Sequence, residues 1–258
     1  MPAKKKAAPA KAAKKPAKAA AKKAPAEEPM QYHVHLRPSD IGRYVILPGD
    51  PGRVPKIAAH FDNAREVAFN REYRTFTGTV DGIKVSCTST GIGCPSTAIA
   101  VEELIKCGAD TFIRIGTCGS YKPEVKLGSL VIAQGACTDS NYGTERGIPG
   151  KYSAIADFGL LRKAVDQAEK MGLDYEVGNV MTSDVFYNAS PDQGLWPKLG
   201  VLAVEMEAYG LYFNAAVSGK KALAILSVSD NVVTGEQLSA EDRAQGLNTM
   251  IRLALEIV

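Results

Sequence analysis

Residues 111–119 read Thr-Phe-Ile-Arg-Ile-Gly-Thr-Cys-Gly. The run Thr111–Ile115 is mostly apolar and β-branched, which predicts a strand, and the glycines that follow predict a turn. The preceding segment, Ser96–Cys107, is typical of a helix that ends at Gly108. Short strands that end in glycine-rich turns and alternate with helices indicate an α/β domain with a mostly parallel sheet.

The same alternation extends along the rest of the chain. Further strands are predicted at Tyr44–Leu47, Val85–Ser89, Leu130–Ala133 and Ala222–Ser229. Further helices are predicted at Ala156–Met171, at Val204–Ser218 and from an N-cap near Ser239 to the end. Ala222–Ser229 is apolar at nearly every position, as expected of a central strand that is covered on both faces. Residues 31–258 are therefore predicted to form a single α/β domain.

The net charge of +3 is distributed unevenly along the chain. Residues 1–29 hold nine Lys and two Glu, whereas the remainder holds 22 Lys+Arg and 26 Asp+Glu. With twelve Ala, five Pro and no aromatic residue, this segment cannot bury a core, so residues 1–30 are predicted to be a disordered tail. Two interpretations stay open: salt-dependent, non-specific contact with nucleic acid phosphates, or a merely solubilising extension.

The composition excludes several classes of protein. The longest apolar runs are far shorter than the roughly 18 residues of a membrane span, and the tail lacks the apolar stretch of a secretory signal. Five cysteines without a Cys-x-x-Cys pair argue against a disulfide scaffold, so a cytoplasmic location is expected. Three histidines leave little room for a His-rich metal site, and no metal is predicted.

Four glycine-rich or polar clusters follow predicted strands and should meet at one edge of the sheet: Gly49–Arg53, Gly91–Gly93, Arg114–Thr117 and Ser229–Asn231. Turns of this kind expose backbone N–H groups, and an arginine can hold an oxyanion in a bidentate fashion. The clusters therefore predict a phosphate site. The chain has neither Gly-x-Gly-x-x-Gly nor Gly-Lys-Ser/Thr, which disfavours a dinucleotide or P-loop site.

In this order, the motifs resemble the nucleoside phosphorylase family of the uridine phosphorylase and hexameric purine nucleoside phosphorylase type. The resemblance covers about residues 33–258 and rests on Pro48–Arg53, Thr90–Gly93, Ile113–Gly119, Val204–Ala208 and Ser229-Asp230. It implies a single α/β domain with a mixed, partly barrel-like central sheet flanked by helices. It also implies homohexamers built as trimers of dimers, and reversible phosphorolysis of nucleosides. No cofactor is expected, since inorganic phosphate is a co-substrate.

The resemblance also implies roles for individual residues. Phosphate binding falls to Gly49, Arg53, Arg114 and Thr117, together with Arg71, which the family lends across a dimer interface. Nucleoside binding falls to Cys118, Gly119, Phe186, Met206 and Glu207. Two purely structural alternatives stay open. Arg71 forms a surface ion pair with Glu66 or Glu72, and Met206 fills space in the hydrophobic core.

A histidine near the start of the fold reaches the neighbour's sugar in this family. Spacing alone does not choose between His33 and His35, but His35-Leu36 precedes the first strand as in the uridine-type members, so His35 is preferred.

Asp230 matches the acid that protonates N7 of a departing purine, and Arg243 matches the arginine that approaches this acid. The alternative for Asp230 is a turn residue after a strand. Asn231 departs from the histidine usual in the purine enzymes.

The predicted function is that of a purine nucleoside phosphorylase. Phe69–Gly78 and Thr88–Glu103 look uridine-like, but no Gln and Arg pair that could read a pyrimidine follows Phe186. A uridine or broad-specificity phosphorylase is thus the first alternative. A nucleosidase and a non-catalytic nucleic-acid-associated protein are the more distant ones.

Overall fold

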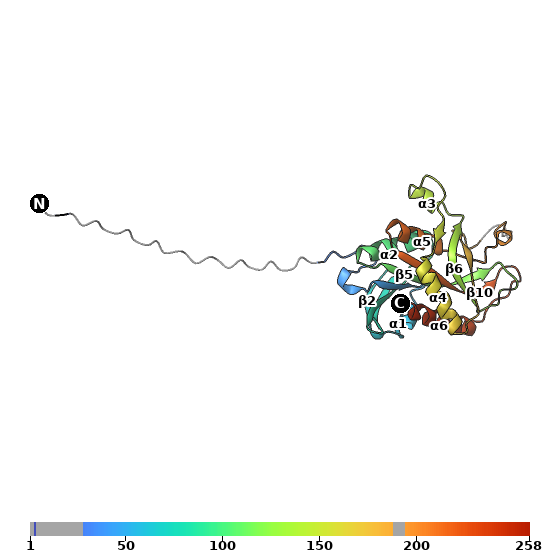
Figure 1. Ribbon diagram of the computed structural model, residues 1–258, viewed down its shortest axis with the longest axis horizontal. Coiled ribbons are helices and arrows are strands. Elements are labelled where there is room, and N and C mark those ends of the chain that lie inside the picture. The colour runs from blue at the N-terminus through green and yellow to red at the C-terminus, as the bar shows by residue number, and fades with distance from the viewer. Residues whose placement is uncertain (1–2, 4–27, 188–193) are drawn as a thin grey trace.

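The computed structural model describes Ala3 and residues 28–187 and 194–258 (Figure 1). Most of the predicted tail, residues 1–30, therefore lies outside the described residues. The end of that segment already contacts the domain, because the Glu28 carboxylate accepts a hydrogen bond of 2.9 Å from the backbone N of Ser39.

The described residues form ten strands of one sheet and several helices. The strands are β1 (Tyr44–Leu47), β2 (Asp62–Asn70), β3 (Tyr73–Val80), β4 (Ile83–Thr88), β5 (Thr111–Ser120), β6 (Leu130–Thr138), β7 (Ala154–Ile155), β8 (Tyr175–Thr182), β9 (Ala203–Glu205) and β10 (Lys221–Asn231). The α-helices are α1 (Val54–Ala58), α2 (Gly93–Lys106), α3 (Tyr142–Glu145), α4 (Phe158–Lys170), α5 (Ala208–Val217) and α6 (Ala240–Glu256), and Pro38–Asp40 and Pro197–Leu199 are 3-10 turns.

Part of the sheet closes on itself. The strand order runs β10-β6-β8-β9-β5, and β5 pairs with β10 as well, so these five strands form a ring. Strands β1, β4, β3 and β2 continue outward from β5. The expected mixed, partly barrel-like sheet with flanking helices is confirmed.

The mostly parallel sheet that the alternation of elements suggested is wrong. Of the ten strand pairings described, five are parallel and five antiparallel. Strands β2, β3 and β4 form a meander whose two short turns need no crossover helix, and β6 runs antiparallel to β10.

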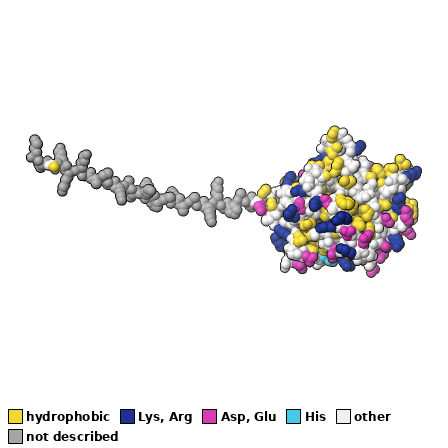
Figure 2. All heavy atoms as spheres, in the orientation of Figure 1, with side chains coloured by type: hydrophobic (Ala, Val, Ile, Leu, Met, Phe, Trp, Pro, Cys, Tyr) yellow, Lys and Arg dark blue, Asp and Glu magenta, His cyan; other side chains and the backbone are white. Residues whose placement is uncertain are grey.

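Helices cover the sheet and complete the core. Helix α5 is buried from Ala208 to Ala215 and packs against α2, while α6 and α4 pack against β10. The predicted N-cap is confirmed: the Ser239 hydroxyl accepts a hydrogen bond of 3.1 Å from the Asp242 backbone N. On the face drawn in Figure 2, Lys/Arg and Asp/Glu side chains are interspersed rather than segregated.

Three local predictions were wrong at their boundaries. Gly116–Gly119 and Ser229–Asn231 lie inside β5 and β10 rather than in turns, because the two strands stay paired out to Ser120 and Asn231. Val204 and Glu205 belong to β9, and the helix predicted from Val204 begins at Ala208.

Candidate active site

The paired ends of β5 and β10 place Asp230 opposite Gly119. A Cβ atom at Gly119 would lie 2.8 Å from Asp230 Oδ2, so a larger residue would displace the carboxylate from its place over this backbone. The Ser229 hydroxyl donates a hydrogen bond of 2.7 Å to Asp230 Oδ1. Asp230 is therefore a half-buried, oriented carboxylate inside a strand, not a turn residue.

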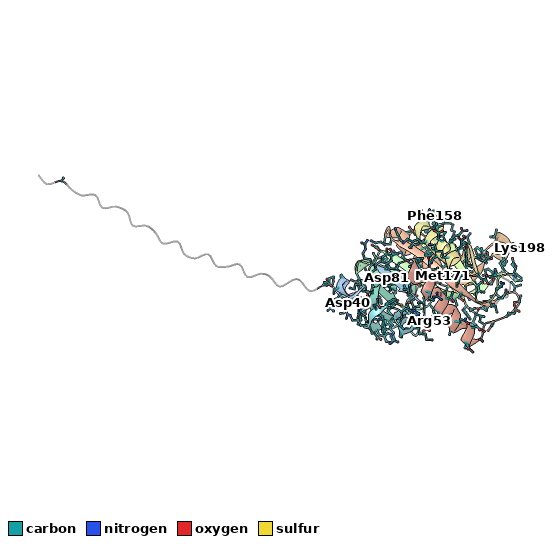
Figure 3. All side chains as sticks on the ribbon, turned by 60° about the horizontal axis from the view of Figure 1, so that its bottom comes forward. Asp40, Arg53, Asp81, Phe158, Met171 and Lys198 are labelled. Atoms are coloured by element: carbon teal, nitrogen blue, oxygen red, sulfur yellow. The ribbon has the colours of Figure 1, made fainter. Side chains whose placement is uncertain are left out.

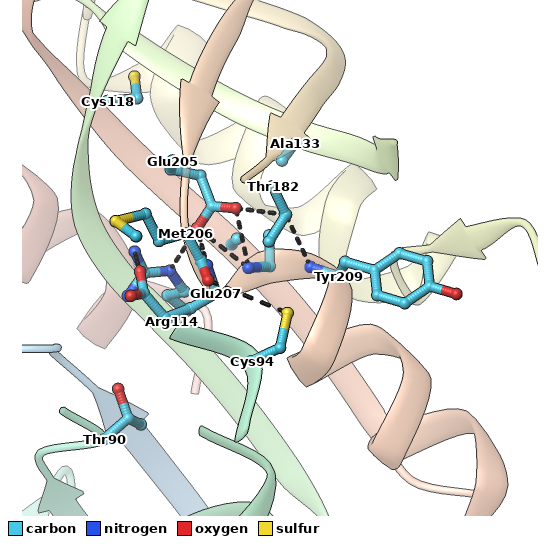
Figure 4. A network of polar contacts seen from close by, with 12 residues as sticks. Thr90, Cys94, Arg114, Cys118, Ala133, Thr182, Glu205, Met206, Glu207 and Tyr209 are labelled. Carbon is cyan, nitrogen blue, oxygen red and sulfur yellow. Dashed lines mark hydrogen bonds and ion pairs between the residues drawn. The ribbon is translucent and has the colours of Figure 1, made fainter. Parts of the chain in front are cut away.

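Arg114 lies on β5 in the interior, with only 4% of its surface exposed. Its guanidinium binds two carboxylates in different directions: Nε donates to Glu205 Oε2 over 3.1 Å, and Nη2 donates to Glu207 Oε2 (Figure 4). A Cβ at Gly116 would come within 2.8 Å of Arg114 Nη2, so the glycine next along this face provides the space for the guanidinium.

Glu207 has a second anchor. Its Oε1 accepts a hydrogen bond of 2.7 Å from the backbone N of Gly93, the first residue of α2, and the residue is 5% exposed. The predicted glycine turn after β4 and the predicted sugar-binding carboxylate therefore meet, although they are 114 residues apart.

Sequence reasoning assigned no role to Glu205, which organises this part of the site. Its carboxylate accepts hydrogen bonds from the Thr182 hydroxyl (2.5 Å) and from the backbone N of Glu207 and Ala208 (both 2.9 Å) (Figure 4). It thus caps the N-terminus of α5 while it holds Arg114. The available signal was its place three residues before Ala208 in Val-Glu-Met-Glu-Ala.

The pKa values of Arg114 and Glu207 are both raised. This favours the charged form of the arginine and disfavours the charged form of the glutamate. Burial lowers the pKa of Arg114, but the negative charges of Glu207 and Glu205 outweigh it, and the net pKa is raised. Burial raises the pKa of Glu207; Arg114 opposes this rise and Glu205 adds to it. Arg114 therefore stays charged, and it is the positive partner of both Glu205 and Glu207.

Arg53 follows the turn after β1 and precedes α1. Backbone hydrogen bonds from Thr90 to Pro48 (2.9 Å) and from Gly91 to Gly49 (3.0 Å) bring the two glycine turns together. A Cβ at Gly49 would lie 3.2 Å from the Gly91 carbonyl oxygen, a tight contact that a glycine at position 49 avoids.

Arg53 lies within electrostatic range of both Arg114 and Arg243. Burial lowers the pKa of Arg53; Asp50 opposes this, and the positive charges of Arg114 and Arg243 lower it further. Figure 3 labels Arg53 in the lower part of the domain. Mutual repulsion of buried or half-buried guanidinium groups is relieved when an anion binds among them.

Arg243 does not pair with Asp230 in this structure. Its Nε donates to the Leu238 backbone oxygen over 3.2 Å, its side chain is exposed on the first turn of α6, and no ion pair to Asp230 forms among the described residues. Arg243 is thus fixed by the start of its own helix.

Thr117 and Cys118 follow one another on β5 with opposite orientations. Thr117 is half-buried, whereas the Cys118 thiol is buried and donates to the Ser227 carbonyl oxygen over 3.7 Å. Burial raises the pKa of this thiol. Cys118 therefore presents backbone rather than sulfur to the site.

Met206 and Phe186 belong to two other segments and differ in exposure. Met206 is half-buried between the buried Glu205 and Glu207, and it belongs to neither hydrophobic cluster of the described residues, which argues against core filling. Phe186 is 76% exposed and contacts Tyr187 edge-on with ring centroids 5.0 Å apart. The residues just beyond it, 188–193, lie outside the described ranges.

His35 and Arg71 lie on the outer surface, away from this network. Both are exposed and both adopt positive φ angles, +52° and +56°, a region that is uncommon for arginine. The alternative in which Arg71 pairs with Glu66 is wrong, because Arg74 binds Glu66 at 2.6 Å. Burial raises the pKa of Glu72, but hydrogen bonds and the charge of Arg71 outweigh this effect, and the net pKa is lowered.

A separate hollow of about 430 Å³ opens at the opposite, amino ends of β1, β5 and β10, beside Tyr44, Thr111 and Lys221. Its lining mixes Asp157 and Asp166 with basic side chains and contains none of the predicted site residues. The parts of the chain that the structure describes hold no cluster of three or more His, Cys, Asp or Glu suited to a metal ion. None of the helices in those parts is both long and apolar enough to cross a bilayer.

Comparison with known proteins gives a consistent picture. A family model described as "Phosphorylase superfamily" matches residues 43–258. A DeoD-type purine nucleoside phosphorylase of Caldanaerobacter subterraneus subsp. tengcongensis is 46% identical over 231 residues, which cover 88% of this chain and 100% of the relative. A uridine phosphorylase of Thermococcus kodakarensis is 42% identical over 239 residues, covering 86% of this chain and 84% of the relative.

A solved structure is similar as well. The crystal structure of purine nucleoside phosphorylase from Toxoplasma gondii in complex with immucillin-H superposes with a TM-score of 0.82 at 29% identity. The match covers 88% of this chain and 94% of that chain.

Proposed function

Because this chain belongs to the phosphorylase superfamily, we propose that it is a purine nucleoside phosphorylase. It converts purine ribonucleosides or deoxyribonucleosides and phosphate, reversibly, into free base and pentose 1-phosphate. The resemblance to nucleoside phosphorylases is confirmed by the family match and the relatives. Within the chain, the proposal depends chiefly on one observation: the buried Arg114 guanidinium binds Glu207 and lies within electrostatic range of Arg53.

Phosphate binds first to the arginines. Arg53 and Arg114, with the backbone at Gly49 and the Thr117 hydroxyl, hold the anion, and Arg71 of a second copy completes its neutralisation. Arg114 already neutralises Glu207, so bound phosphate shares this guanidinium with the sugar-binding carboxylate. Fixing the nucleophile next to the sugar removes much of the entropic cost of a two-substrate reaction.

The sugar and base are held by the other half of the site. Glu207 accepts hydrogen bonds from the sugar hydroxyls, Met206 packs on the sugar, and His35 of a second copy contacts it from outside. The purine lies against Cys118, Gly119 and Phe186. A phosphate oxygen attacks C1′ while the C1′–N9 bond breaks and its electrons pass to the base. Asp230 donates a proton to N7 of that base, with Arg243 moving from its present contact to assist.

The assembly is proposed from the resemblance to nucleoside phosphorylases. The working unit is a homohexamer, a trimer of dimers, that acts in the cytoplasm. No metal or organic cofactor takes part, because arginines supply the positive charge and Asp230 supplies the proton. Phosphate is consumed as a co-substrate.

A panel of five nucleosides tests this proposal against its alternatives. Inosine, adenosine, guanosine and deoxyinosine are expected to react with phosphate, and uridine at least about 100-fold more slowly, because no Gln and Arg pair that could read a pyrimidine follows Phe186. Initial rates with and without phosphate decide the matter. Uridine turnover equal to that of inosine would favour the uridine phosphorylase alternative, and base release without phosphate would favour a nucleosidase.

For the tail we propose non-specific contact with nucleic acid. Nine lysines in residues 1–29 could neutralise enough phosphates that affinity for DNA falls by about 10³-fold or more between 50 and 200 mM salt. A chain lacking residues 1–29 is expected to lose this binding while keeping the turnover of the full chain. Fluorescence anisotropy of a labelled duplex, with the enzyme assay alongside, measures both. Equal DNA binding by the two chains would show the tail to be a solubilising extension.

A further inference from the structure

Two exposed residues that the proposed function assigns to a second copy, His35 and Arg71, sit on neighbouring surface elements. His35 lies in the segment Gln31–Leu36, which is closed by a hydrogen bond of 2.9 Å from the Gln31 backbone N to the Leu36 oxygen. Arg71 occupies the two-residue turn between β2 and β3, where Asn70 pairs with Tyr73. Within the described ranges neither side chain makes a hydrogen bond or an ion pair.

Glu103 of α2 holds the first of these elements. It is 7% exposed, and its two oxygens accept hydrogen bonds from the backbone N of His33 (2.9 Å), the backbone N of Val34 (2.9 Å) and His33 Nδ1 (2.7 Å). Val34 and Leu36 are fully buried on either side of His35. The segment is therefore fixed to the domain with His35 directed outward, and His33 is occupied by its contact with Glu103.

Asn70 joins the second element to the first. Its Nδ2 donates a hydrogen bond of 2.7 Å to the carbonyl oxygen of His33. The backbone N of the same residue donates to Glu103. Asn70 directly precedes Arg71 in the chain. One peptide segment is thus clamped from both sides, by a carboxylate from α2 and an amide from β2.

The backbone next to this clamp has an unusual conformation. Four non-glycine residues of the described chain have positive φ, and three of them, His35, Asn63 and Asp81, are of types enriched in this region. The fourth is Arg71, in the turn between β2 and β3. Uncommon backbone conformations persist where the surroundings enforce them, and they concentrate at functional positions.

We propose that Asn70 and Glu103 are positioning residues, which hold the segment carrying His35 and the turn carrying Arg71 as one unit that completes the site of a second copy of this chain. The inference rests on the proposed function, since it requires a site shared between copies. Neither residue touches substrate. Glu103 is held in its charged form, because the donors around it outweigh the effect of burial and lower its pKa.

Glu103→Gln and Asn70→Asp test the clamp. In Glu103→Gln the side chain has one acceptor oxygen, whereas the contacts of Glu103 use two. In Asn70→Asp a carboxylate replaces the amide that donates to the His33 carbonyl oxygen, so this hydrogen bond is lost. Each change is expected to lower kcat/KM by about 10- to 100-fold through misplacement of His35 and Arg71. Glu102→Gln, which breaks only a surface pair with Arg146, is the matched control and should leave kcat/KM unchanged.

Subunit mixing separates positioning from general damage. Each variant is exchanged with excess Asp230→Ala subunits, whose own site is inactive but whose His35 and Arg71 are intact. Activity per Glu103→Gln or Asn70→Asp subunit should then rise about ten-fold or more, because the intact unit comes from the partner. Arg71→Ala mixed in the same way should also regain activity, with exchange verified by labelled subunits.

The outcomes distinguish the two proposals. If Arg71→Ala regains nothing, the shared site is wrong and the clamp falls with it. If Arg71→Ala regains activity but Glu103→Gln and Asn70→Asp do not, or if these two lose no activity alone, the clamp is wrong and the shared site stands. If Glu103→Gln does not assemble, as judged by light scattering, Asn70→Asp alone decides.

Discussion

Phosphorolysis of inosine falls by about 10²–10⁴-fold when Asp230 is replaced by Asn, while nucleoside affinity changes little. Asparagine keeps the shape over Gly119 and can still accept a hydrogen bond from Ser229, but it has no acidic proton to give to N7. Steady-state rates and nucleoside binding by calorimetry, at saturating phosphate, separate the two effects.

The control substrate and the control variant make this result specific. The base of 7-methylguanosine already carries positive charge and needs no proton, so its loss in Asp230→Asn should be far smaller than that of inosine. Asp174→Asn removes an exposed carboxylate that faces Lys126 across the surface and should change neither rate. Equal losses on inosine and 7-methylguanosine would show that Asp230 is not the acid.

Arg114→Ala is expected to weaken phosphate use far more than nucleoside binding, and also to destabilise the fold by about 3–5 kcal/mol. The reason is the same for both effects: Arg114 is the positive partner of the buried Glu205 and Glu207. Its loss leaves two uncompensated carboxylates in the interior. Arg146→Ala, which breaks an exposed pair with Glu102, should cost no more than about 1 kcal/mol.

The stability loss in Arg114→Ala should depend on pH. Burial raises the pKa of Glu207 above its ordinary value of 4.5, and removing Arg114 raises it further. A carboxyl group with a raised folded-state pKa takes up a proton on folding, so stability falls as pH rises from 4.5 through that pKa. Urea unfolding should therefore show a smaller deficit near pH 5 than near pH 8.

Arg114→Lys separates catalysis from folding. Lysine restores the charge but cannot reach both carboxylates and phosphate with a planar fork, so it should recover stability better than phosphate use. A variant at position 114 that keeps the wild-type phosphate saturation curve would contradict the assignment.

Local features of this chain were predictable because they depend on neighbouring residues. The strand Tyr44–Leu47 was found with its predicted bounds, and the cap at Ser239 was found where the apolar spacing begins. The glycine and arginine motifs indicated an anion site and, by resemblance, the family. Arg114, Glu207 and the glycine turns then proved to lie together.

Closure of the ring was decided by the tertiary structure. The end of β5 looked like a turn because Gly116 and Gly119 interrupt its apolar run, yet pairing with β10 and β9 keeps it extended. The two glycines make room for Arg114 and Asp230 rather than for a bend. Space requirements of this kind come from side chains elsewhere in the chain and leave no local pattern.

The contact of His33 with Glu103, the contacts of Glu205 and the separation of Arg243 from Asp230 became visible only in the fold. Arg114 meets Glu205 across 91 residues of chain, and His33 meets Glu103 across 70. The sequence alone determined the kinds of element and, through the order of its motifs, the family, because periodicity and motifs act over a few positions. Which charges share a buried site depends on contacts between distant segments, since the free energy of a buried ion pair is set by its partners in space.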